Sequence, residues 1–153
     1  MKDGVELKRE LYHKCTQYID QRIESIQKKL DDVSESRSNE TKSSAGDKHE
    51  TGRTMMQLEE QKATVQLYAA LEVKQTMEQI DINKENNVAA LGSLVICDKG
   101  NYYIAISSGK MKIDETLYYG ISLQSPIGIM LAGKLIGDQV DFNGRLIVVK
   151  EIY

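Results

Sequence analysis

Two acidic residues, Asp47 and Glu50, stand three positions apart in the segment Gly46-Asp47-Lys48-His49-Glu50, directly before a run of residues with good helix propensity. This spacing suits helix capping, because Asp can act as the N-cap and Glu can complete a capping box. Carboxylate oxygens are also the ligands that Mg²⁺ prefers, and this ion often takes only one or two of them together with water and phosphate. Two carboxylates in a polar turn cannot hold such an ion tightly by themselves. The residues alone leave capping and metal binding open.

Two segments with helical periodicity flank this pair. The first covers residues 5 to about 36 and carries a heptad-like stripe between charged faces. That stripe consists of Ile19, Ile23, Ile26, Leu30 and Val33, continued towards the amino terminus by Leu7, Leu11, Cys15 and Tyr18. The second covers about 54–82 and carries a weaker stripe of Leu58, Val65, Ala69, Val73, Met77 and Ile80. Residues 34–52 between them are rich in Ser, Thr, Asn and Gly, which predicts a polar turn. Residues 1–82 are therefore expected to form an antiparallel coiled-coil hairpin with its tip near 34–52.

After a polar linker at residues 83–87, the periodicity changes to short strands rich in Val, Ile and Tyr. The expected strands are Ser93–Cys97, Tyr102–Ser107, Leu117–Leu123, Val140–Phe142 and Leu146–Ile152. Turns are expected at 98–101 and 108–110, and Asn143-Gly144 gives a strong hairpin signal. Ser125 as N-cap and Pro126 at the first helical position predict one short helix. Residues 88–153 are thus expected to form a small, mostly antiparallel β domain, and the fold class is α+β.

Composition narrows the possible functions. The 153 residues carry a formal net charge of −3, whereas direct duplex binding would normally require a basic excess. The cysteines, Cys15 and Cys97, lie too far apart for a metal-binding motif and are expected to be buried. No apolar run approaches the roughly 20 residues that span a bilayer, and the amino-terminal segment lacks the apolar stretch of a signal peptide. We expect a soluble, cytoplasmic protein without independent DNA binding.

Residues 122–140 read SLQSPIGIMLAGKLIGDQV. The pattern SPxGxxLxGKxxGDxV within them resembles the carboxy-terminal domain of the bacterial Gre-type transcript-cleavage factors (GreA/GreB). The order of a helical hairpin, a linker and a small domain also matches this family, whose second domain is related in fold to FKBP-type prolyl isomerases. The family's hairpin tip typically reads Gly-Asp-x-x-Glu, which Gly46, Asp47 and Glu50 match. The tip departs from the usual form after Glu50, where Thr51-Gly52-Arg53 replaces Asn and further acidic and aromatic residues.

The resemblance implies a transcription elongation factor that binds RNA polymerase at its secondary channel, with Ser125, Pro126, Ile127 and Gly128 in the polymerase-binding motif. It also implies that Asp47 and Glu50 help the polymerase to hold a Mg²⁺ ion near the 3′ end of backtracked RNA and so stimulate the polymerase's own cleavage of that RNA. Such a factor is not an independent enzyme, and an intramolecular hairpin predicts a monomer. Three alternatives remain open: a channel-binding regulator or inhibitor without cleavage, an FKBP-like prolyl isomerase, and a dimeric coiled-coil adaptor.

Overall fold

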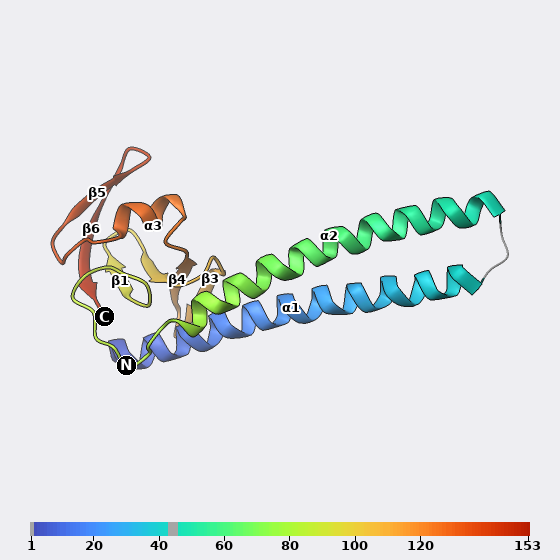
Figure 1. The fold of residues 1–153 in the computed structure, drawn as a ribbon. Helices are drawn as coiled ribbons and strands as arrows, with labels where there is room; N and C mark the ends of the chain where they lie inside the picture. The colour runs from blue at the N-terminus through green and yellow to red at the C-terminus, as the bar shows by residue number, and fades with distance from the viewer. Residues whose placement is uncertain (1, 43–45) are drawn as a thin grey trace. The chain divides into compact units, whose positions relative to one another are not determined.

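The computed structural model describes residues 2–42 and 46–153, with side chains over residues 2–39 and 52–153. The described elements are α1 (Gly4–Lys42), α2 (Gly46–Glu78), β1 (Leu94–Cys97), β2 (Asn101–Ile104), β3 (Gly109–Ile113), β4 (Thr116–Ile121), α3 (Pro126–Leu131), β5 (Gln139–Phe142) and β6 (Arg145–Ile152). Contacts divide the chain into two compact units: residues 1–18 with 75–153, and residues 19–74. This confirms the predicted α+β class, a helical hairpin followed by a mostly antiparallel sheet with a short helix (Figure 1).

Helix α1 buries Leu11, Cys15, Ile19, Ile26 and Val33 of the stripe that its sequence predicts, but the prediction is wrong at Tyr18, which is 41% exposed. Asp3 precedes the helix, and its side chain accepts a hydrogen bond from the main-chain N–H of Glu6 at 2.8 Å, as an N-cap does. Within residues 19–42, Ile19, Ile26 and Val33 are at most 7% exposed. Their spacing of seven residues keeps one side of α1 against α2 over the length of the hairpin arm.

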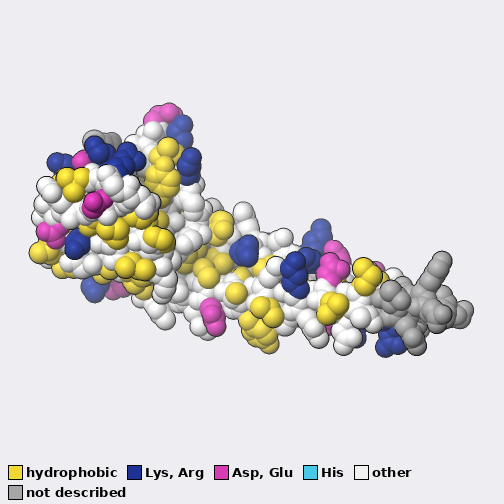
Figure 2. Space-filling view, turned by 90° about the horizontal axis from the view of Figure 1, so that it is seen from above, with side chains coloured by type: hydrophobic (Ala, Val, Ile, Leu, Met, Phe, Trp, Pro, Cys, Tyr) yellow, Lys and Arg dark blue, Asp and Glu magenta, His cyan; other side chains and the backbone are white. Residues whose placement is uncertain are grey.

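Helix α2 presents a different face to α1 from the one that its apolar pattern predicts. The buried positions are Ala63, Ala70 and Met77, again seven residues apart. The predicted stripe is wrong over most of its length, because Leu58 and Val65 are 60% and 69% exposed. Alanines therefore occupy two of the buried positions of α2, and larger apolar residues of the helix face outward. Figure 2 shows hydrophobic side chains on the surface of the hairpin.

Ion pairs lie beside this packed face. Lys74 Nζ lies 2.8 Å from Asp20 Oδ1, and the Arg37 guanidinium pairs with the carboxylate of Glu60. Each pair joins α1 to α2, which run side by side in Figure 1. Exposed pairs of this kind contribute little stability, roughly 0–1 kcal/mol each. Their importance is geometric, since opposite charges at fixed positions select one register between two helices.

The helices extend further into residues 34–52 than the sequence predicts. Helix α1 continues to Lys42, and α2 begins at Gly46, so most of the Ser-rich segment that predicted a turn has helical backbone. Low helix propensity costs only a few tenths of a kcal/mol per residue. Arg37, which lies beyond the predicted helix end, is held by its pair with Glu60. At the other end, α2 stops at Glu78, four residues earlier than predicted.

The six strands form one sheet in the order β3-β4-β2-β1-β6-β5. In the described part of the chain, four strand pairings are antiparallel and one, β2 with β4, is parallel. Strand β3 is absent from the sequence prediction, which placed a turn at residues 108–110. Its alternating exposed and buried residues, with Lys110 and Lys112 exposed, are typical of an edge strand protected by charge. The Asn143-Gly144 turn has positive φ at both residues, as the hairpin signal predicts.

Both faces of the sheet are buried. On one face, α3 covers a core that includes Val95, Ile104 and Val149. On the other, Tyr103 is fully buried near Tyr12 and Cys15 of the first turns of α1. Cys15 Sγ lies 3.5 Å from Ser108 Oγ and 3.9 Å from Met111 Sδ, both of which belong to the sheet side of the unit.

Both cysteines are free and buried, as expected. Burial raises the pKa of the Cys97 thiol to about 11 and also raises that of Cys15. Because residues 1–18 share a compact unit with the sheet, the contacts divide the chain differently from the predicted linker at residues 83–87. The independent folding of residues 88–153 remains a prediction. No helix among the described residues combines the length and the apolar character that crossing a membrane requires.

The inner face of α2 can be tested by a matched pair of substitutions. Ala63→Leu should reduce the free energy of unfolding by about 1–3 kcal/mol, because Ala63 is fully buried and the added atoms have no space. Ala69→Leu adds the same atoms on the exposed side and should change it by less than about 0.5 kcal/mol. Urea unfolding followed by far-ultraviolet circular dichroism measures both. Equal effects, or a larger loss at Ala69, would contradict the observed face and restore the predicted stripe.

Candidate partner-binding site

Helix α3 is built by its first residues in the way the sequence predicts. Ser125 has extended backbone, with φ −69° and ψ 155°, and its Oγ accepts a hydrogen bond from the main-chain N–H of Gly128 at 3.1 Å. The same hydroxyl donates to the main-chain oxygen of Ser122 at 2.7 Å. Pro126 occupies the first helical turn, where it sacrifices no helical hydrogen bond. Ser125 therefore fixes both the start of α3 and the chain leading into it.

Position 128 requires glycine because neighbouring atoms lie too close for a side chain, and not because the backbone has a special angle there. A Cβ atom at this position would lie 2.0 Å from the main-chain oxygen of Ser122 and 2.9 Å from Ser125 Oγ. Contacts this short force the backbone to move. The capping arrangement around Ser125 thus depends on the absence of a side chain at Gly128.

The two sides of α3 have different environments. Ile127 and Leu131, four positions apart, lie in the core beneath the helix and are 9% and 0% exposed. Ile129, halfway between them, points to the opposite side and is 64% exposed. One turn of helix therefore anchors α3 through two side chains and presents a third, large and apolar, to solvent.

The loop after α3 is held by Gly133 and Asp138 of the motif. Gly133 has φ +81°, which a residue without Cβ adopts readily, and its main-chain N–H donates to Ala89 O at 2.8 Å. Asp138 Oδ2 accepts from the main-chain N–H of Leu135 at 2.8 Å. The loop so formed leaves Leu135 and Ile136 50% and 61% exposed. We refer to Ile129, Leu135 and Ile136 together as the α3 apolar surface.

The structure separates the sequence-predicted binding residues into two groups. Ser125 and Pro126 shape the start of the helix, while Ile127 and Gly128 are buried within the domain. The resemblance assigns Ile127 to the polymerase-binding motif, and its side chain belongs to the core. The exposed apolar residues were not singled out. Helical spacing could have identified Ile129, because positions two residues from both Ile127 and Leu131 must face away from their side.

The predicted tip acids, Asp47 and Glu50, lie outside the residues whose side chains the structure describes. Their segment follows directly from Gly46, the first residue of α2. The donor chemistry of two carboxylates suits a hard cation such as Mg²⁺. Within the described residues, no group of three or more His, Cys, Asp or Glu side chains could hold a metal ion.

Comparison with known proteins identifies a similar solved structure but no matching family model or curated protein. Among solved structures, the chain is similar to one described as the structure of the transcription factor Gfh1, with 18% sequence identity and a TM-score of 0.36 over 90% of this chain and 92% of that chain. The functional interpretation of this protein rests on its own motif residues.

The close approach at Gly128 predicts a specific sensitivity. Gly128→Ala should destabilise the protein by at least about 1–3 kcal/mol, because the new methyl group displaces the Ser122 carbonyl and leaves buried polar groups poorly paired. Ile129→Ala, one position away on the exposed side, should change the free energy of unfolding by less than about 0.5 kcal/mol. Denaturant titration of both variants measures the difference. A Gly128→Ala variant as stable as the parent would show that the backbone around Ser122 yields easily.

Proposed function

We propose that this protein is a transcription factor of the Gre type, which binds RNA polymerase at the secondary channel and stimulates cleavage of backtracked RNA. The observation that carries the proposal is the SPxGxxLxGKxxGDxV pattern, in a chain that also carries a Gly-Asp-x-x-Glu segment at the start of the second helix of a hairpin. The chain would act as a monomer in the cytoplasm and not as an independent enzyme, because the catalytic centre belongs to the polymerase.

Docking is assigned to the β domain. Interfaces bury large apolar side chains at their centre, and a few such residues supply most of the binding energy. The α3 apolar surface offers three of them within a segment whose backbone is fixed by Ser125, Gly133 and Asp138. Ser125 to Gly128 thus contribute to polymerase binding by building the segment, and Ile129, Leu135 and Ile136 make the contact.

In this proposal the hairpin carries the tip residues to the 3′ end of the backtracked RNA. Residues 19–42 of α1 span roughly 36 Å at 1.5 Å per residue, and the packed face against α2 keeps this arm extended. Asp47 and Glu50 would lend carboxylate oxygens at the 3′ end of backtracked RNA. When bound there jointly with the polymerase's own acidic residues, Mg²⁺ supplies Lewis-acid stabilisation and a water nucleophile for phosphodiester hydrolysis.

A second candidate function keeps the partner and removes the cleavage. Residues Thr51-Gly52-Arg53 stand where the family's tip commonly carries Asn with further acidic and aromatic residues. A tip with fewer acidic groups has fewer ligands for a shared cation. The protein would then occupy the channel as a regulator or inhibitor, and the cleavage assay separates the two functions.

Substitutions at the tip distinguish metal binding from capping. Asp47→Asn and Glu50→Gln should each lower the rate of transcript cleavage by one to several orders of magnitude at saturating factor, about 1.4 kcal/mol of barrier for each factor of ten. Asn is as good an N-cap as Asp, so a capping role alone predicts little change for Asp47→Asn. The measurement is the shortening of RNA in stalled, backtracked polymerase complexes across a Mg²⁺ titration.

Glu59→Gln is the matched control, because Glu59 is an exposed acid on α2 away from the tip. It should cleave like the parent protein, and all three variants should keep their helix content and polymerase affinity. If the parent protein binds polymerase and gives no stimulation, the regulator becomes the better account. If the parent protein does not bind polymerase, both candidate functions fail.

Docking through the α3 apolar surface predicts a loss of affinity without a loss of fold. Ile129→Ser and Leu135→Ser should each weaken polymerase binding at least about fivefold, since truncating a central apolar contact costs more than about 1 kcal/mol. Leu146→Ser is the control, because Leu146 is 51% exposed but lies on β6. Biolayer interferometry with purified polymerase measures the three affinities. Equal affinities for all three variants would exclude this surface.

A further inference from the structure

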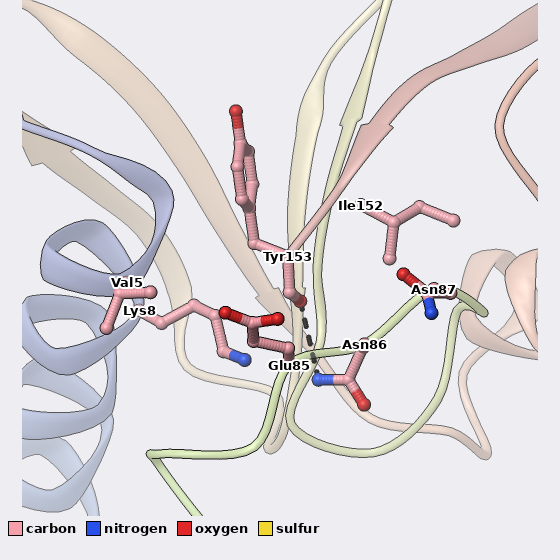
Figure 3. Close-up of a pocket in the computed structure, with 7 residues that line it drawn as sticks. All are labelled: Val5, Lys8, Glu85, Asn86, Asn87, Ile152 and Tyr153. Atoms are coloured by element: carbon pink, nitrogen blue, oxygen red, sulfur yellow. Dashed lines mark hydrogen bonds between the residues drawn. The ribbon is translucent and has the colours of Figure 1, made fainter.

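A cavity of about 260 Å³ lies within the unit that contains the sheet, apart from the α3 apolar surface. It is lined by Val5, Lys8, Glu85, Asn86, Asn87, Ile152 and Tyr153 (Figure 3). Binding sites for drug-sized molecules usually measure about 300–1,000 Å³, while one water molecule takes about 30 Å³ of liquid volume. The cavity therefore suits a small organic molecule.

Lys8 is the unusual member of this lining. It is only 3% exposed, and its ammonium donates one hydrogen bond, to the main-chain oxygen of Lys84 at 2.7 Å. An ammonium has three N–H donors, and a buried charge is costly without a counter-charge. Among the residues that the structure describes, no carboxylate forms an ion pair with Lys8. Burial lowers the pKa of Lys8, and the charges of Asp81 and Glu85 act in the opposite direction.

The other lining residues complete a site of mixed character. The Glu85 side chain approaches from the linker after α2, whereas Lys8 approaches from α1 (Figure 3). The Asn86 amide donates to the main-chain oxygen of Tyr153 at 3.4 Å, which keeps that segment beside the end of β6. Val5 and Ile152 contribute apolar wall. The cavity thus places an ammonium and a carboxylate, not paired with each other, beside an apolar surface.

These features restrict the class of ligand. A simple anion would meet Lys8 favourably but would be repelled by Glu85 and Asp81, and a simple cation would meet the carboxylates favourably but would leave the buried ammonium of Lys8 without a counter-charge. A zwitterion satisfies both charges at once without changing the net charge of the site. We propose that this cavity binds a small α-amino acid with an aliphatic side chain, whose carboxylate faces Lys8, whose ammonium faces Glu85 and whose side chain contacts Val5 and Ile152.

Calorimetric titration of the full chain tests the proposal with three matched probes: L-leucine, 4-methylpentanoate, which lacks the amine, and isopentylamine, which lacks the carboxylate. Leucine should bind at least tenfold more tightly than either analogue. In amide NMR spectra it should shift the side-chain signals of Asn86 and Asn87. Absence of leucine binding at millimolar concentration would overturn the proposal. A carboxylate that binds as tightly as leucine would overturn the zwitterion assignment.

Three variants connect the binding to the cavity. Lys8→Met and Glu85→Gln should each weaken leucine binding at least tenfold, whereas Lys110→Gln on the exposed edge strand should leave it unchanged. Lys8→Met removes a buried group, so thermal unfolding of each variant accompanies the titration. Glu85 is exposed, and Glu85→Gln keeps the test valid should Lys8→Met fail to fold. Unchanged leucine affinity in a folded Glu85→Gln variant would contradict the proposed site.

Discussion

The structure depends on a six-stranded sheet whose two faces are both apolar and must both be covered. Strand β2 shows the constraint within three residues: Tyr102 and Ile104 pack with the core beneath α3, and Tyr103 between them is buried on the opposite face. One short helix can cover only one face. The first turns of α1 cover the other, which joins the root of the hairpin to the sheet in a single compact unit.

In the motif after β4, the residues that the pattern specifies differ from the residues that form the exposed apolar surface. Ser125, Gly128 and Gly133 are required for a cap, a close approach and a left-handed turn. The pattern specifies Leu131, which is fully buried. Apart from Ile127, the large apolar residues at the unspecified positions of the pattern are more exposed than Leu131. Ile129, Leu135 and Ile136 stand at such positions. A pattern of this kind therefore identifies the scaffold, and the side chains that it presents can differ from one protein to another.

Much of the fold could be predicted from local chemistry. The cap at Ser125 and the turn at Asn143-Gly144 each depend on residues close in sequence, and both were confirmed. The stripe of α1 was confirmed at its heptad positions Ile19, Ile26 and Val33, but not at Tyr18. The inner face of α2 could not be predicted by counting large apolar residues, because small alanines, Ala63 and Ala70, occupy it. Strand β3 was missed for a related reason. Gly109 and the lysines of β3 are typical of a turn, and the pairing with β4 makes this segment a strand.

The candidate site was predicted less completely than the fold. The sequence located the segment through Ser125 and Gly128, but which apolar side chains reach solvent depends on how α3 rests on the sheet. Asp47 and Glu50 remain predictions. Lys8, by contrast, looks like one more charged residue on an amphipathic helix until its 3% exposure is known.

The order of the strands has a consequence for how the chain acquires its structure during synthesis. Residues 19–74 make contacts between two consecutive helices, and these contacts can begin to form once α2 emerges. The sheet cannot, because β6 pairs with β1 and β5, with Val95 opposite Ile152, and it follows every other strand in the chain. Non-local pairing of this kind is slow. During translation, the nascent hairpin would be ordered before β6 is synthesised, and the edge of β1 that pairs with β6 would still be unpaired. The chain most needs protection from aggregation during that interval.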